Sequence, residues 1–223
     1  MYSIVQAERD RLSKMTRQIA KKTVNAAYSP SRATSLAARF AQSGIVAAGA
    51  LVFARLGFAK ARVEDILEEA GIARRTFYKS FKSKDEVLAA IYDIATSELL
   101  KAIREIRAEG DPLAGIRLGL DAYLDYHVDN SALLKVLVEQ ASLSDSPLAS
   151  ARLRFRAELT ALLDAGVAAA GGERHDAKVY LALISALEGL SLDLLAQGAT
   201  LRDVTRCKRA MHHLLDRVLV SSK

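Results

Sequence analysis

The sequence predicts an all-α protein, with a small three-helix unit in its first half and a larger helical domain after it. Two observations predict this fold class. Alanine and leucine dominate the 223 residues, which include only three prolines, and β-branched runs with period two are absent. Apolar residues recur instead at three- and four-residue intervals, and glycine, proline or capping residues separate the periodic stretches.

Residues 1–36 are polar and basic, and we expect them to form a mobile arm. Leu12, Met15 and Ile19 have the spacing of a marginal amphipathic helix, which the stretch from Tyr28 to Ser31 would interrupt. Such an arm either adds contacts to DNA phosphates or the minor groove, as homeodomain arms do, or is a leader without a function.

Three helices are expected in the next unit, residues 37–83. The first spans about residues 35–56, with Ile45 and Val52 on its apolar side, and ends at Gly57. Two short helices follow over residues 63–70 and 73–80, and Gly71 lies in the turn between them. Because glycine adopts a positive φ without a Cβ clash, this spacing predicts a helix-turn-helix.

The remaining residues, 84–223, are expected to form a helical domain. Ser83 is an N-cap for its first helix, and Glu86 is placed to complete a capping box. Further boundaries are marked by Asp111-Pro112, Ser146-Pro147, Gly171-Gly172, Asp176, Gly198 and Thr200. The expected helices span about residues 84–108, 112–129, 132–141, 147–170, 176–197 and 201–220.

The last two of these helices carry more apolar surface than one domain needs. The first is apolar around most of its circumference, and the second has a seam with alternating three- and four-residue steps. We therefore expect a homodimer, with a purely intramolecular bundle as the alternative. The residues assigned to the dimer interface are Leu183, Leu187, Leu190, Leu194, Val204, Met211, Leu214 and Val218.

The excess of positive over negative charge is confined to the first part of the chain. Residues 1–88 carry 16 Lys and Arg against 8 Asp and Glu, whereas residues 89–223 carry 16 against 18. This asymmetry suggests one part that faces a polyanion and another with a different task; a basic tail that only aids solubility would give the same count.

The second short helix of the helix-turn-helix has the composition of a DNA-reading helix. Phe77 and Phe81 are expected to pack inward, which leaves the polar side chains exposed. Arginines at the N-terminal end of such a helix reach base edges, while tyrosine and lysine bind phosphate. The side chains concerned are Arg74, Arg75, Tyr78 and Lys79.

These residues also carry a resemblance. The segment from Ile45 to Glu86, above all its pattern AGI…TFYxxFxSK, resembles the DNA-binding domain of the TetR family of transcriptional regulators. The resemblance implies a DNA-reading head and a variable helical domain that dimerises. It also implies phosphate contacts by Thr76, Tyr78 and Lys84, and a major-groove position for Arg74, Arg75 and Lys79.

Two positions depart from the pattern of the family. Its usual Thr or Ser before the first motif helix is replaced by Ala61-Arg62, so that a cap is lost, although Arg62 can contact phosphate by charge. Ala73 stands where Ser often caps the recognition helix, a cap typically worth about 1 kcal/mol.

By the same resemblance, the helical domain is expected to bind a small-molecule effector, whose binding would release DNA. Polar or aromatic residues on otherwise apolar stripes are the candidates to line its pocket, although each is also compatible with an ordinary core or surface position. They are Tyr92, Tyr123, His127, Glu139, Gln140 and Glu188. Glu188 requires a partner if it is buried.

No catalytic or metal-binding motif is recognisable, so we expect no enzyme, cofactor or metal site. Cys207 is the only cysteine, and no apolar run reaches the length of a membrane span, which favours a cytoplasmic protein. The sequence thus predicts a TetR-like repressor, released from a palindromic operator by a small molecule. The alternative is a DNA-binding protein without a ligand, acting through protein partners or as a structural nucleoid factor.

Overall fold

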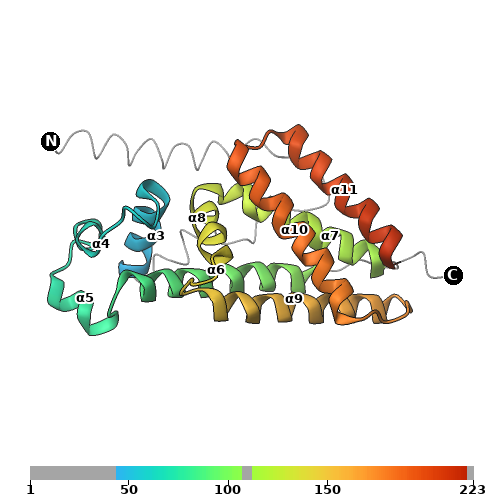
Figure 1. Ribbon diagram of the computed structural model, residues 1–223, viewed down its shortest axis with the longest axis horizontal. Helices are drawn as coiled ribbons and strands as arrows, with labels where there is room; N and C mark the ends of the chain where they lie inside the picture. Colours follow the sequence, from blue (N-terminus) through green and yellow to red (C-terminus); the bar gives the residue numbers. More distant parts are fainter. Residues whose placement is uncertain (1–43, 107–111, 220–223) are drawn as a thin grey trace. The chain divides into compact units, whose positions relative to one another are not determined.

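The computed structural model describes residues 44–106 and 112–219, and these form helices joined by short turns (Figure 1). The basic arm assigned to residues 1–36 and the start of the helix expected from residue 35 lie outside the described residues. The helices are α3 (Gly44–Leu56), α4 (Val63–Ala70), α5 (Arg74–Ser80), α6 (Lys84–Glu105), α7 (Pro112–Asp129), α8 (Ser131–Ser142), α9 (Ala149–Ala169), α10 (Ala177–Gln197) and α11 (Leu201–Leu219).

The head consists of α3, α4 and α5, packed on the first turns of α6. Phe53, Ile66 and Phe77 have no exposed surface and form its centre, one from each of the three helices. α3 crosses α6 closely at Gly49, where a Cβ would lie 2.5 Å from Val87 Cγ1. The head is thus built on the N-terminal part of α6.

The larger domain surrounds α10, which contacts α7, α8, α9 and α11. By length and composition, Ala177–Ala196 is the one candidate membrane span in the described part of the chain. Its core-facing residues, such as Tyr180 and Leu187, are buried among the neighbouring helices. Its Glu188 forms ion pairs with arginines of α9. These are the contacts of the central helix of a bundle.

Most of the expected helix boundaries are confirmed to within two residues. Gly57, Gly71 and Gly198 have φ near +70°, as helix-ending glycines do. Two details differ. α6 ends at Glu105 rather than near residue 108. Glu86 accepts a hydrogen bond from the backbone of Lys82 rather than from the N-cap Ser83.

The assignment of residues to a dimer interface was wrong for five of its eight members. Leu183, Leu187, Leu194, Val204 and Met211 are at most 8% exposed within the single chain. The seam of α11 packs against α7 and α10 of its own chain, and Arg117–Asp216, Lys208–Asp125 and His212–Asp121 contacts fasten α11 to α7. Leu214 is exposed, while Leu190 and Val218 are half-buried.

Candidate DNA interface and helical-domain cavity

The recognition helix α5 presents the side chains that the sequence assigned to DNA. Arg74, Arg75, Thr76, Tyr78 and Lys79 are all exposed, whereas Phe77 between them is fully buried. The ring of Phe77 meets those of Tyr78 and Phe81 at 5.3 and 6.0 Å. This arrangement gives α5 one anchored face and one polar face with three positive charges.

The two unusual cap positions differ from each other. Arg62 begins α4 without a side-chain acceptor, but its backbone N–H donates to Asp65 Oδ2 at 2.7 Å, which is half of a capping box. Ala73 begins α5 with no side-chain hydrogen bond, as expected. The lost cap is therefore partly replaced at α4 and not at α5.

Arg74 has a partner within the head. Its guanidinium forms an ion pair with Glu64 on the first turn of α4, and both side chains are more than half exposed. An exposed pair of this kind contributes little to stability, so Arg74 can exchange the carboxylate for a nucleic-acid acceptor. Sequence reasoning did not foresee this competitor.

Lys84 has a structural role that the sequence did not indicate. Its ammonium donates to the carbonyl oxygens of Phe58 and Ala61 at 2.7 and 2.8 Å, and lies 4.4 Å from the centre of the Phe58 ring. The side chain thus ties the α3–α4 loop to the start of α6. Its phosphate contact stays a prediction, to be made with the one ammonium hydrogen these bonds leave.

Residues 45–91, which comprise α3, α4, α5 and the start of α6, match the family described as "Bacterial regulatory proteins, tetR family". The DNA-binding domain belongs to the TetR family. The chain is accordingly a transcriptional regulator with a helix-turn-helix that binds DNA.

Three further similarities extend beyond the head. An uncharacterised HTH-type transcriptional regulator of Haemophilus influenzae is 24% identical over 157 residues, 70% of this chain and 74% of the relative. A TetR transcription regulator of Haloarcula marismortui is 21% identical, with a TM-score of 0.67 over 79% of this chain and 96% of its own. FadR of Bacillus subtilis, solved in complex with stearoyl-CoA, is 16% identical, with a TM-score of 0.64 over 78% and 97%.

The helical domain contains a cavity of about 440 Å³, within the range of small-molecule sites. The lining residues come from the C-terminal end of α6 and from α7, α9, α10 and α11. Leucines and isoleucines make up most of the lining, and Gly115, Gly119 and Gly166 contribute positions without a side chain.

A second, much smaller pocket lies between α6, α7, α8, α9 and α10, and most of the candidate ligand-binding residues meet there. Tyr92, Tyr123, His127 and Glu188 line it, and Tyr123 also lines the large cavity. Glu139 and Gln140 line neither pocket, and Glu139 is exposed on α8. The apolar stripe of α8 faces the core through its neighbours, such as Leu137 and Ala141, so effector contacts by Glu139 and Gln140 stay a prediction without support from either pocket.

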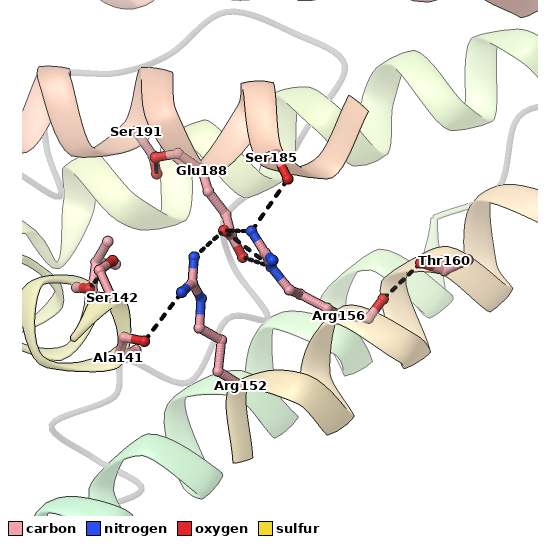
Figure 2. Close-up of polar contacts among 9 residues, drawn as sticks. Ala141, Ser142, Arg152, Arg156, Thr160, Ser185, Glu188 and Ser191 are labelled. Atoms are coloured by element: carbon pink, nitrogen blue, oxygen red, sulfur yellow. Dashed lines mark hydrogen bonds and ion pairs between the residues drawn. The ribbon is translucent and has the colours of Figure 1, made fainter. Parts of the chain in front are cut away.

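Glu188 has the partners that its position in an apolar helix requires (Figure 2). Arg152 donates to its carboxylate at 2.8 Å, and Arg156 donates to both of its oxygens. Arg152 also reaches the carbonyl of Ala141, so the cluster joins α8, α9 and α10. Burial opposes ionisation, but the two arginines outweigh it and hold the pKa of Glu188 below its usual value.

His127 is the buried titratable group beside this cluster. It is 4% exposed, its ring stacks on Tyr123 at 4.2 Å, and its Nδ1 lies 2.8 Å from the Tyr123 carbonyl oxygen. Burial lowers its pKa to about 4, against the opposing effects of that hydrogen bond and of Glu188. At neutral pH the imidazole is therefore uncharged.

Proposed function

We propose that this regulator is a repressor in the cytoplasm that binds a palindromic operator as a homodimer and is released by a small molecule in the helical-domain cavity. The observation that carries the proposal is the position of the cavity. Ile103, Arg104 and Ile106, at the end of α6, form part of its wall. The other end of the same helix supports the DNA-binding head.

The connection along α6 supports a mechanical link between effector and DNA. Val87, Leu88 and Ile91 belong to the core that includes the head, and Lys84 is bonded to the α3–α4 loop. A ligand that displaces the C-terminal end of α6 would therefore move the head with it. Such a change alters the separation of the two heads in a dimer and so the affinity for a site with fixed spacing.

The glycines of the cavity wall support its use as a ligand site. Glycine within a helix costs roughly 0.5–1 kcal/mol relative to alanine, yet α7 has Gly115 and Gly119 on the cavity side. The complex of the similar B. subtilis regulator with stearoyl-CoA supports an effector with a long apolar part.

The dimer is proposed to form through the outward face of α10. Ala182, Ser185, Gly189 and Ala196 are exposed along it, with Asp193 as the one charged residue among them, and small residues let two helices approach closely. The outward face of α11 is a poorer centre for a two-fold interface, because it exposes Arg202, Arg206, Arg209 and Arg217. Like charges would then meet across the axis. Leu190 and Leu214 remain available at the edge.

The proposal is tested by footprinting the chain on DNA that flanks its own gene. A protected palindrome that a small molecule releases supports it. Gly119→Leu, which narrows the cavity, should retain operator binding and lose release. Gly119→Ala is the matched control, because its Cβ would lie at an ordinary 3.5 Å from Ile103 Cγ2. Sequence-independent binding without any releasing ligand would contradict the proposal.

A further inference from the structure

The large cavity is lined almost entirely by apolar residues and by one charged residue that reaches solvent. Apart from Tyr123 and Arg104, its lining consists of leucine, isoleucine, alanine, methionine and glycine. Tyr123 lies deep in the domain at 2% exposure, with its hydroxyl beside Ser191. Arg104 is the one lining residue with a formal charge, and its side chain is 50% exposed. The cavity therefore offers an apolar body and a cationic rim.

The guanidinium of Arg104 is held at that rim by Glu158 of α9. The two form an ion pair, and Glu158, which is 48% exposed, is not part of the cavity wall. Exposed ion pairs of this kind contribute little to stability, because water screens them and two long side chains must be ordered. A second anion can consequently compete with Glu158 for Arg104 at low cost.

We propose that the effector is an amphipathic anion, an alkyl chain with an anionic head group. The chain fills the apolar cavity, and the head group binds Arg104 in place of Glu158. Arginine suits this role because its planar guanidinium can donate two parallel hydrogen bonds to a carboxylate or phosphate. This inference rests on the proposed function, since it names the chemistry of the effector at the same site.

The two ends of the ion pair should have opposite effects on binding. Arg104→Gln removes the cation that holds the head group, so the anion binds more weakly. Glu158→Gln removes the competitor, so the same anion binds more tightly. If the ion pair only stabilises the packing of α6 on α9, the two substitutions instead change binding in the same direction, because each removes the same ion pair.

The alkyl chain of the effector should contribute to binding only through the burial of its apolar surface. Each methylene that enters the cavity is expected to improve binding about fourfold, until the chain no longer fits. This dependence should be the same in all the variants of the ion pair, because the substitutions lie at the rim. Chain length and head group can thus be separated.

The experiment measures binding of decanoate, decanol and decanoyl-CoA to the full-length chain and its variants. Calorimetry is suitable, because the chain has no tryptophan to report binding by its own fluorescence. The matched control is Arg154→Gln, since Arg154 of α9 pairs with Asp93 of α6 at similar exposure and lies outside the cavity wall. Octanoate and dodecanoate give the dependence on chain length.

We expect decanoate to bind about fivefold more tightly than decanol, the upper range for one exposed ion pair. Arg104→Gln should abolish this preference, Glu158→Gln should increase it, and Arg154→Gln should leave it unchanged. If decanoyl-CoA alone shows the dependence on Arg104, the anion is supplied by the phosphates of coenzyme A. Equal binding of decanol and decanoate overturns the inference but leaves the proposed function standing. If no probe binds and Gly119→Leu does not alter operator release, both fail.

Discussion

His127 should make the stability of the helical domain depend on pH in a window of its own. Its pKa is lowered to about 4 by burial in the folded chain, against about 6.5 when unfolded. Below pH 6.5 the unfolded chain therefore binds a proton that the folded chain does not, and stability falls until the pH reaches about 4. Between pH 7 and pH 5 this linkage amounts to about 2 kcal/mol.

The prediction is tested with His127→Gln, by urea unfolding followed by circular dichroism at pH 7 and pH 5. The free energy of unfolding of the variant at pH 7 can differ from that of the wild type, so the comparison is the change between pH 7 and pH 5. On acidification the variant should lose about 2 kcal/mol less than the wild type. His213→Gln, which changes an exposed histidine of α11, is the control and should retain the full wild-type loss. If His127→Gln loses as much stability as the wild type, the imidazole is protonated in the folded chain and the reasoning is refuted.

Three further predictions concern the ion cluster, the cavity wall and the head. Glu188→Gln leaves two arginines without their carboxylate, which destabilises the folded chain. Because these side chains are partly exposed, we expect the free energy of unfolding to fall by about 2 kcal/mol, less than for a fully buried pair, as measured by chemical unfolding at pH 7. Because the pKa of Glu188 is lowered, this difference should disappear as the pH falls well below 4. Gly119→Ala should stabilise the chain by roughly 0.5–1 kcal/mol, whereas Gly166→Ala should not, because its Cβ would lie 2.8 Å from Ile116 Cγ1; equal thermal shifts would count against this contrast. Lys79→Ala should reduce the slope of log affinity against log salt by roughly 1, and an unchanged slope would show that Lys79 contacts no phosphate.

The head could be read from the sequence because its signals are local. Gly57 and Gly71 each mark a helix end by a backbone requirement of a single residue, and Ser83 marks a start through bonds to the next turn. The roles of Arg74 and Lys84 were less accessible. Their partners, Glu64 and the loop carbonyls, are ten or more residues away, and no periodicity indicates which polar side chains meet.

The dimer interface illustrates what periodicity leaves open. The spacing of Val204 and Met211 correctly indicates that this face of α11 is buried. The same spacing arises whether the partner is another copy or another helix of the same chain. Acidic residues on α7 decide the matter, since Asp121 and Asp125 pair with α11 within one chain, but their register becomes visible only in three dimensions.

The cavity escaped prediction for a different reason. Polar residues on apolar stripes of the sequence indicate Tyr123 and Glu188, but the polar groups of both are satisfied by neighbours. The larger space is defined by what α7 lacks at Gly119, and by leucines that are typical of any core. A missing side chain leaves space only if no neighbour fills it: Val87 occupies that position at Gly49, whereas the corresponding atom at Gly119 is 3.5 Å away. Helical glycines whose Cβ position no neighbour occupies are therefore the signal that structure adds to sequence in this domain.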